Sequence, residues 1–377
     1  NLIMICIDGC RFDRAENWKR VSDYLPGTNY CSKSITYAPY TNSSVHAVFS
    51  GSYGNRNGCY SYWHSLKFKN NDFKTITKYL KDKNYYTYAD IHSKLALPLD
   101  DFDNFEVYDE TNSDLIERHK KLIKSMKDKN SQDQNFFLYL HYEKIHTGIM
   151  NSVLKKYTNF SNEYFQNKEE NEKRYDFLFE KSEIYLKNIL DEIKNQNLTH
   201  NTLIVIFSDH GISLGEKIGE RAYGAFCYDY TIRTFGAFIS SKFKSNFISQ
   251  QTRHVDILPS IIDHLQIEFD KNFQNFDGHS IIPLFFGKTL PEKIAFTETA
   301  NPLNEKMPPK RPNTKSVRIS DWKLIFNEYD DTKELYNLKD DPNEENNLYG
   351  HSLPIENELW TELLKINKLW KFFTCNL

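Results

Sequence analysis

Short, unbroken apolar runs recur along the chain at 2–7, 135–140 and 203–207. Such runs are typical of β-strands that are buried on both faces. Two more strands are expected at 85–91 and 233–239, and helical spacing of apolar residues predicts helices at 73–83, 113–129, 175–194 and 255–265. Because strands alternate with helices, we predict a doubly wound α/β fold, with a mainly parallel sheet covered by helices on both faces.

The pattern changes beyond about residue 285. The segments 294–297, 316–319 and 322–327 have the length of short antiparallel strands, and 355–373 has the pattern of a closing helix. We therefore expect an α/β domain over 1–289 and a small C-terminal α+β subdomain with antiparallel strands over 290–377. The polar segment 159–173 is expected to be a surface excursion.

Charge and composition narrow the class of protein. The 48 Lys and Arg residues nearly balance the 51 Asp and Glu residues, so nucleic acid is not an expected partner. No window approaches the roughly 20 apolar residues of a membrane span. No signal peptide is visible, although a leader could have been removed. The six cysteines form no CxxC pair, which favours a reducing, cytoplasmic location. Oligomeric state stays open.

Polar side chains follow three of the predicted strands. Asp8 ends the first, Asp209 and His210 end the strand at 203–207, and His141 and His146 follow the strand at 135–140. The carboxyl ends of parallel strands meet at one edge of a sheet, where open α/β proteins keep their active sites. A carboxylate beside an imidazole suits a divalent metal, whereas the alternative is an ordinary polar turn after each strand.

The segment 37–58 adds hydroxyl groups to this picture. It begins as a loop, and we expect a short helix from Ser44, with Ser43 or Ser44 as its N-cap. Thr41, Ser43 and Ser44 all lie near its start. A hydroxyl is a weak nucleophile until a metal or a base lowers its pKa. Two carboxylates, one imidazole and one hydroxyl would make a four-ligand metal site.

Several motifs together resemble the sulfatase-like enzymes of the alkaline phosphatase superfamily. The order of these motifs along most of the chain carries the resemblance, since each one alone is weak. They are IMICIDGCRFDR at 3–14, FSG at 49–51, LKDKNYYTYA at 80–89, the strand into 141–146, SDHG at 208–211, YDYTIRTFGAFI at 228–239, VDILPSII at 255–262, DGHS at 277–280, RISDWKLIF at 318–326 and ELYNLKDDPNEENNL at 334–348.

Three positions depart from the sulfatase pattern. Thr41 stands where sulfatases have the Cys or Ser that becomes formylglycine, Val45 replaces an Arg, and Gly9 replaces a second acidic residue. Threonine cannot become formylglycine by that route. The chain is in this respect similar to threonine-nucleophile phosphodiesterases, phosphonate hydrolases and phosphoglycerol or phosphoethanolamine transferases. The resemblance therefore implies a metal-dependent hydrolase or transferase of phosphodiesters or phosphomonoesters. A sulfuric ester hydrolase without formylglycine, or a non-catalytic binding protein, are the alternatives.

The resemblance also implies residue roles. One divalent ion (Mn, Ca, Mg or Zn) would be held at a single site, and the substrate would be a small-molecule or glycan-linked phosphate or sulfate ester. His141 is expected to support the fold, and His254 is a weaker candidate for a second metal site. The implied site residues are Asp8, Thr41, Asp209 and His210 for the metal, Thr41 as nucleophile, His146 at the transferred group or leaving oxygen, and His92, Lys94, Lys217 and Arg221 for substrate.

Overall fold

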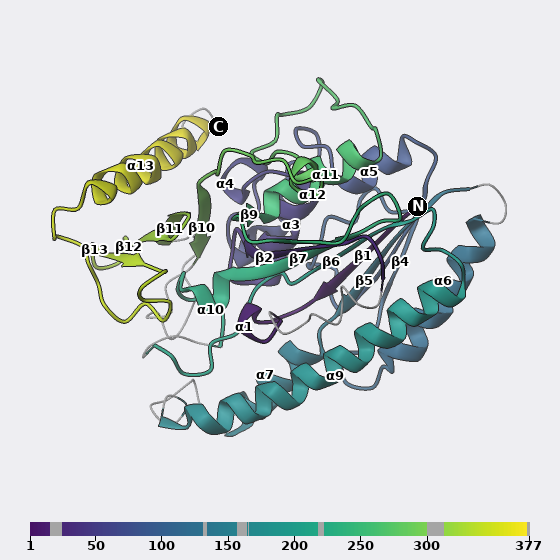
Figure 1. Ribbon diagram of the computed structural model, residues 1–377, viewed down its shortest axis with the longest axis horizontal. Coiled ribbons are helices and arrows are strands. Elements are labelled where there is room, and N and C mark those ends of the chain that lie inside the picture. Colours follow the sequence, from purple (N-terminus) through teal and green to yellow (C-terminus); the bar gives the residue numbers. More distant parts are fainter. Residues whose placement is uncertain are drawn as a thin grey trace.

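The computed structural model describes residues 1–15, 25–130, 134–156, 164, 166–217, 222–299 and 313–374. Its main sheet has nine strands, and eight of them run in the order β4-β3-β5-β1-β6-β7-β2-β8, with β9 also pairing with β2 (Figure 1). The strands are β1 (Leu2–Ile7), β2 (Thr28–Ile35), β3 (Tyr86–Ile91), β4 (Asn104–Val107), β5 (Phe136–Tyr142), β6 (Leu203–Phe207), β7 (Arg233–Ile239), β8 (Asn246–Ile248) and β9 (Thr252–Arg253).

Most neighbours in this sheet are parallel, as the sequence predicts. The exception is β7, which runs antiparallel to both β6 and β2. β1 lies between β5 and β6, and its apolar residues alternate between the two faces of the sheet. Ile3, Ile5 and Ile7 pack into one buried cluster, and Leu2 and Met4 pack into the other. The strand is apolar throughout because both of its faces are covered.

Helices cover the two faces of the sheet (Figure 1). One layer contains α6 (Leu115–Asn130), α7 (Lys144–Lys156) and α9 (Lys168–Asn195). The other contains α3 (Thr41–Ser50), α5 (Ile76–Lys81), α11 (Ile257–His264) and α12 (Ile282–Phe285). The short elements α1 (Phe12–Ala15), α4 (Gly54–Asn57), η1 (Tyr62–Lys67), α10 (Asp229–Ile232) and η3 (His254–Asp256) lie in the connections. The predicted doubly wound fold is thus confirmed.

The C-terminal part forms a second sheet. Its four antiparallel strands run in the order β10-β11-β12-β13, and α13 (Pro354–Thr374) packs against it, with Trp360 edge-on to Phe326. The strands are β10 (Ala295–Thr299), β11 (Thr314–Ile319), β12 (Trp322–Asn327) and β13 (Thr332–Asn337). Within the described ranges, no helix combines the length and the apolar character needed to span a membrane.

Two local expectations were wrong. Residues 168–173, expected to belong to a surface excursion, are already part of α9, which begins at Lys168 and has one buried face, whereas 159–163 and 165 lie outside the described residues. The helix near residue 44 begins earlier than expected, at Thr41. Its N-cap residue is Tyr40, with no side-chain capping bond, so neither Ser43 nor Ser44 is the cap.

Candidate active site

The register of the parallel sheet brings the first two predicted ligands together. Cys6 of β1 pairs with Phe207 of β6, and the same register two residues further sets Asp8 opposite Asp209. The backbone N–H of Gly9 donates to Asp209 Oδ1 at 3.2 Å, across some two hundred residues of chain. Both carboxylates are fully buried at the carboxyl edge of the sheet. The strand exits singled out in the sequence therefore meet in space.

Three unpartnered atoms converge at this edge. Asp8 Oδ1, Asp209 Oδ2 and His210 Nε2 are buried and have no hydrogen-bond partner among the residues that the structure describes. Asp8, Asp209 and His210 each offer one ligand atom within 4.8 Å of the others. Such buried orphan atoms are costly unless something binds them. Their donor set of two carboxylates and one imidazole fits a divalent cation.

The remaining atoms of the same side chains are held in place. Asp209 Oδ1 accepts from the backbone N–H of His210 at 2.9 Å as well as from Gly9. His210 Nδ1 lies 2.8 Å from the carbonyl oxygen of Gly211, an arrangement that fixes the proton on Nδ1 and leaves the Nε2 lone pair free. Hydrogen bonds to the other side-chain atoms of Asp209 and His210 therefore fix the direction in which Oδ2 and Nε2 point.

The electrostatics of the two acids also favour a cation. Burial raises the pKa of Asp209, and the neighbouring charge of Asp8 raises it further. Burial opposes ionisation of Asp8 too, but the charge of His146 and the hydrogen bond from His141 hold the pKa of Asp8 below its usual range. Two buried carboxylates this close repel each other, and a bound divalent ion would remove that repulsion.

Thr41 is the first residue of α3, and its hydroxyl faces the acids. Its Oγ1 donates to Asp8 Oδ2 at 3.2 Å. The side chain is 8% exposed, so it remains reachable from solvent. α3 ends at Gly51, whose φ of 63° is left-handed and suits glycine at a helix C-terminus. Val45, the position of the missing Arg, is completely buried.

The two serines of α3 serve neighbouring contacts. Ser44 Oγ donates to the carbonyl oxygen of Asp209 at 2.8 Å and lies 3.1 Å from His254 Nδ1. The other nitrogen of His254 lies 2.9 Å from Thr234 Oγ1, so both of its ring nitrogens are engaged by hydroxyls. Ser43 Oγ donates to the Tyr40 hydroxyl at 3.2 Å. His254 thus supports the Asp209 loop through Ser44.

His146 stands over the acids together with an aromatic ring. Its Nδ1 lies 3.8 Å from Asp8 Oδ2, and its Nε2 is buried without a hydrogen-bond partner in the described part of the chain. The ring of Tyr223 lies edge-on to His146 at 4.7 Å and is stacked on His210 at 5.0 Å. Tyr223 therefore covers two imidazoles of the site at once.

The four residues expected at the substrate have different surroundings. His92 is close to the acids, and its ring lies 4.5 Å from that of His141. Lys94 is exposed, with its ammonium 5.6 Å from the ring centre of Phe105 at the sheet edge. Lys217 donates to the carbonyl oxygen of Glu344 and lies over Tyr228. Arg221 lies outside the described residues.

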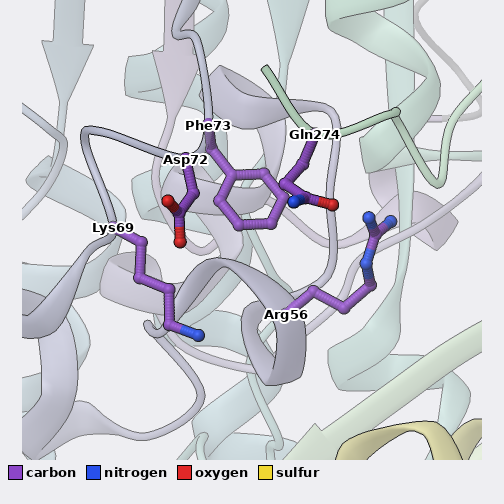
Figure 2. Close-up of a pocket in the computed structure, with 5 residues that line it drawn as sticks. All are labelled: Arg56, Lys69, Asp72, Phe73 and Gln274. Atoms are coloured by element: carbon purple, nitrogen blue, oxygen red, sulfur yellow. The ribbon is translucent and has the colours of Figure 1, made fainter. Parts of the chain in front are cut away.

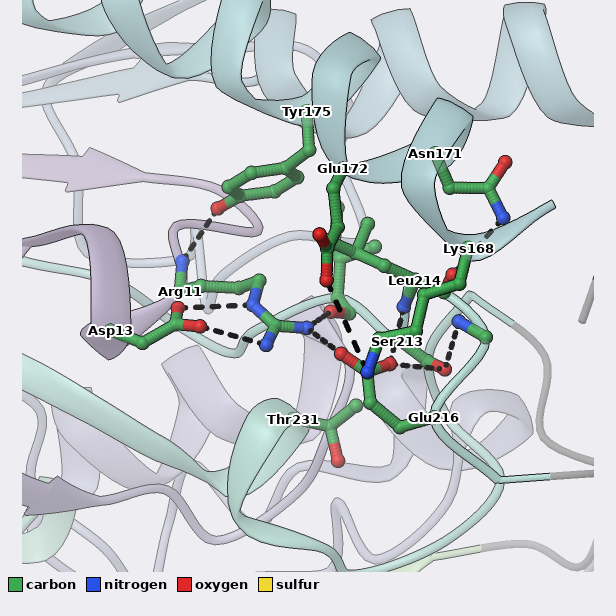
Figure 3. A network of polar contacts seen from close by, with 12 residues as sticks. Arg11, Asp13, Lys168, Asn171, Glu172, Tyr175, Ser213, Leu214, Glu216 and Thr231 are labelled. Atoms are coloured by element: carbon green, nitrogen blue, oxygen red, sulfur yellow. Dashed lines mark hydrogen bonds and ion pairs between the residues drawn. The ribbon is translucent and has the colours of Figure 1, made fainter. Parts of the chain in front are cut away.

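A buried network joins the two loops that carry the acids (Figure 3). The guanidinium of Arg11 donates to the carbonyl oxygen of Ile212 at 2.7 Å and to Glu216 at 2.6 Å, and it also pairs with Asp13. Arg11 follows β1 and Glu216 follows β6, so these bonds tie together the loops after the two strands. The network therefore ties the loop that carries Asp8 to the loop that carries Asp209.

A separate hollow near α4 offers no comparable chemistry (Figure 2). It has a volume of about 40 Å³ and is lined by Arg56, Lys69, Asp72, Phe73 and Gln274. One buried water needs roughly 10–15 Å³ of such space, so this hollow suits a few waters more than an ester substrate. Arg56 is already paired with Asp277 at 2.6 Å. The buried ligand atoms without partners among the described residues lie at the acids instead.

Two residues near the acids gained no site role from the sequence. His141 was expected to support the fold, yet its Nε2 lies 3.1 Å from Asp8 Oδ2. His141 pairs with Cys6 across the parallel strands, two residues before Asp8. The place of His141 at the end of the apolar run at 135–140 was the sequence signal for its nearness to Asp8. Tyr223 lies in a segment without any local pattern, so only the fold reveals where its ring lies.

Comparison with known proteins places this geometry in a family. A family model described as Sulfatase matches residues 16–267, about two thirds of the chain. The chain belongs to the sulfatase family. Enzymes of the sulfatase family use a metal ion, and the cluster of Asp8, Asp209 and His210 is one that can hold it. No curated protein matches the chain by sequence.

Solved structures share the fold at low sequence identity. A protein solved with its substrate D-glucosamine-2-N,6-O-disulfate has 16% identity and a TM-score of 0.73, covering 98% of both chains. A phosphonate monoester hydrolase of Agrobacterium radiobacter has 11% identity and a TM-score of 0.76, covering 98% of this chain and 96% of its own. A 2-O GAG sulfatase has 15% identity and a TM-score of 0.70, covering 100% and 92%. At these identities the likeness establishes the fold alone.

Proposed function

We propose that this sulfatase-family chain is a cation-dependent hydrolase or transferase of phosphate esters that uses Thr41 as its nucleophile. One observation carries the proposal. The Thr41 hydroxyl, at the start of α3, lies beside Asp8 within a group of buried ligand atoms that lack partners among the described residues. A nucleophile, its activating cation and an anionic ester can all meet at this point.

The preference for phosphate over sulfate rests on the nucleophile. A threonine side chain is not a precursor of formylglycine by the route that sulfatases use. A hydroxyl activated by a cation attacks phosphorus directly. The phosphonate monoester hydrolase among the solved structures gives a related chemistry on the same fold. Together these points favour a phosphate or phosphonate ester over a sulfate ester.

Each residue would have a distinct task. Asp8, Asp209 and His210 would hold the cation, which when bound lowers the pKa of the Thr41 hydroxyl and neutralises charge on the transferred group. Thr41 Oγ1, having lost its proton to solvent, forms a bond to phosphorus. The bond to the ester oxygen breaks, and its electron pair leaves with that oxygen. Water or an acceptor alcohol then releases the phosphoryl group from Thr41.

The residues around Thr41 would orient the ester. His146 has a free Nε2 within the described contacts and can donate a hydrogen bond to the transferred group or to the leaving oxygen. The N-terminus of α3, where Thr41 lies, favours negative charge through the helix dipole. His92, Lys94, Lys217 and Arg221 remain candidates for contacts with the rest of the substrate. Holding the ester in line with Thr41 is worth several orders of magnitude in rate.

Chromogenic esters test this function. Turnover should be measured on a nitrophenyl phosphomonoester, a nitrophenyl phosphodiester and a nitrophenyl sulfate, with Mn²⁺ or Zn²⁺ added. We expect one of the phosphate esters to be the best substrate. A clear preference for the sulfate would favour a sulfuric ester hydrolase, and the absence of turnover on all three would favour a binding protein.

The first prediction concerns the nucleophile. Thr41→Ala should lower kcat by at least about 1,000-fold, because the covalent step is lost, while the chain still binds its cation. Ser43→Ala is the matched control in the same helix and should keep most of the activity. Unchanged activity of Thr41→Ala, with loss in Ser43→Ala, would move the nucleophile to Ser43.

A further inference from the structure

Two histidines stand on the side of Asp8 that faces away from His210. His141 lies near the end of β5, which pairs with β1, and His92 follows β3, which pairs with β5. The strand order β3-β5-β1 therefore brings His92, His141 and Asp8 to adjacent positions at the same edge of the sheet. His141 contacts Asp8 but takes no part in the proposed reaction.

The atoms of these residues are within ligand distance of one another. His141 Nε2 lies 3.1 Å from Asp8 Oδ2, and the rings of His92 and His141 are 4.5 Å apart. His92 Nδ1 is buried and has no hydrogen-bond partner within the described ranges. Asp8, His92 and His141 each offer one ligand atom within 4.8 Å of the others. A buried nitrogen without a partner, in a histidine that stands within ligand distance of a carboxylate, points to a bound species.

We propose that a second divalent cation binds between Asp8, His92 and His141, so that the carboxylate of Asp8 bridges two cations. The inference rests on the proposed function in one respect, since it shares Asp8 with the first site. The two oxygens of Asp8 have different nearest imidazoles, and Oδ2 also accepts from Thr41 Oγ1 at 3.2 Å. Oδ1 is 3.4 Å from His210 Nε2, and Oδ2 is 3.1 Å from His141 Nε2.

The chemistry of the second site differs from that of the first. Two imidazoles and one carboxylate are the donors that zinc takes in catalytic sites, where a fourth position stays open. The first site is richer in oxygen, with two carboxylates and the Thr41 hydroxyl. Two cations bridged in this way commonly lie about 3.5–4 Å apart and share the charge of a transferring phosphoryl group. We therefore expect the second site to prefer Zn²⁺ over Mg²⁺ or Ca²⁺.

Tyr139 is suited to orient the second ligand set. Its hydroxyl lies 3.0 Å from His141 Nδ1, the ring nitrogen that does not face Asp8. Partners on the far nitrogen of a ligating histidine fix its tautomer and the direction of its free lone pair. When the Tyr139 hydroxyl accepts from Nδ1–H, as the carbonyl oxygen of Gly211 does for His210, the Nε2 lone pair of His141 is left for a cation.

Zinc stoichiometry tests the proposal without any substrate. The full chain should be stripped with a chelator, dialysed against Zn²⁺ alone and analysed for bound metal per chain. We expect two ions in the unmodified protein, and one in both His92→Ala and His141→Ala. Loss of a residue that only orients a ligand weakens metal binding by roughly 10–100-fold. These variants remove a ligand itself, so we expect the affinity for the second ion to fall by roughly 100-fold or more.

A control and a second signal keep the result interpretable. His200→Ala removes an exposed imidazole just before β6, at the opposite end of the strand from Asp209, and should still bind two ions. Co²⁺ in place of Zn²⁺ should give two sets of visible absorption bands, one of which disappears in His92→Gln. His92→Gln also serves as a milder variant if the alanine variants do not fold.

The outcomes separate this inference from the proposed function. One ion in the unmodified chain, unchanged in His92→Ala and lost in Asp209→Asn, would overturn the second site and leave the first in place. His141 would then only donate a hydrogen bond to Asp8. No bound ion in any form would overturn both sites. Two ions that persist in both histidine variants would also overturn the proposal.

Discussion

At the scale of single residues, the backbone at Gly9 explains why the chain has one acid after β1. Its φ of 72° is left-handed, and a Cβ atom there would lie 2.7 Å from Ile212 Cδ1. The N–H of Gly9 also donates to Asp209 Oδ1. A second acidic residue, usual in sulfatases at this place, would be strained here by the left-handed backbone, and the Ile212 side chain would have to shift.

The second prediction follows from this conformation. Gly9→Ala should lower the free energy of unfolding by roughly 1–3 kcal/mol, through the left-handed backbone and the contact with Ile212. It should also weaken cation binding, because the bond to Asp209 is disturbed. Gly287→Ala is the control, since Gly287 has a φ of 74° and a Cβ atom added there would meet nothing within 4 Å. Calorimetry of both variants without Mn²⁺ measures the loss of stability, and calorimetry with Mn²⁺ measures the effect on cation binding. A cation affinity of Gly9→Ala equal to that of the unmodified chain would contradict the prediction.

Sequence reasoning worked for the residues that follow strands. Asp8, Asp209 and His210 were predictable as neighbours because a buried apolar run fixes where a strand ends, and parallel strands end at one edge. The expected serine caps were wrong, because Ser44 donates to the distant carbonyl oxygen of Asp209 and Ser43 donates to the nearby hydroxyl of Tyr40. The roles of Asp8, Asp209 and His210 as metal ligands stay predictions, and so do those of Thr41 and His146.

At the scale of elements, α9 clamps the loop after β1. The hydroxyl of Tyr175 accepts from the backbone N–H of Arg11 at 2.6 Å and donates to the carbonyl oxygen of Gly9 at 2.9 Å. Asn171, one turn earlier, donates to the carbonyl oxygen of Leu214 at 3.0 Å in the loop after β6 (Figure 3). One helix thus holds the two loops on either side of the acids.

The third prediction tests this clamp. Tyr175→Phe should lower the free energy of unfolding by about 1–3 kcal/mol, because the N–H of Arg11 is left buried without its acceptor. It should also weaken cation binding, since Gly9 and Asp8 lose a fixed position. Tyr185→Phe is the control in the same helix, because its buried hydroxyl lies 2.6 Å from His119. Chemical denaturation should give a similar loss of unfolding free energy in both variants. Metal titration should show weaker cation binding in Tyr175→Phe alone. Equally weak cation binding in Tyr185→Phe would contradict the proposed role of Tyr175.

Elements with clear periodicity were predictable, and the others were not. β1, β6 and β7 have the bounds expected from their apolar runs. β2 was missed because its interior is polar: Asn29 Nδ2 and Ser32 Oγ find their acceptors, the carbonyl oxygens of Lys244 and Ile248, only in the folded chain. β4 and β8 are edge strands with exposed residues, so their sequences lack a buried pattern. The antiparallel direction of β7 has no local signal at all.

At the scale of the whole molecule, buried charges join the two sheets. Asp229 of α10 pairs with Arg318 at 2.5 Å and with Lys323 at 2.8 Å, both on the C-terminal sheet. Glu298 of β10 accepts from the hydroxyl of Tyr37, just before the Thr41 segment, at 2.5 Å. Burying such groups without partners is costly, so each sheet completes the other.

The fourth prediction uses Glu298. Burial raises the pKa of Glu298 to about 7, against the opposing charge of Lys315 and the hydrogen bond from Tyr37. Because this folded-state value exceeds the unfolded one of about 4.3, its contribution to stability is full at low pH and is lost as the pH rises through 7. Relative to Glu298→Gln, the unmodified chain should lose about 2–3 kcal/mol of unfolding free energy between pH 5 and pH 8.

Urea unfolding at each pH measures this difference. Glu328→Gln is the control, since Glu328 also pairs with Lys315, at 2.7 Å, but its side chain is 43% exposed. It should keep the pH dependence of the unmodified chain. Parallel pH profiles for the unmodified chain and Glu298→Gln would show that Glu298 is already ionised in the folded state at pH 5.

The five described cysteines are free thiols, and all of them are buried. In the folded chain they are shielded from alkylating reagents, so each labelling event reports a transient opening of the structure. Cys6 and Cys10 stand on either side of Asp8 in the chain, and burial raises the pKa of both thiols. The rate at which these two sulfurs are alkylated therefore measures how often the segment after β1 opens.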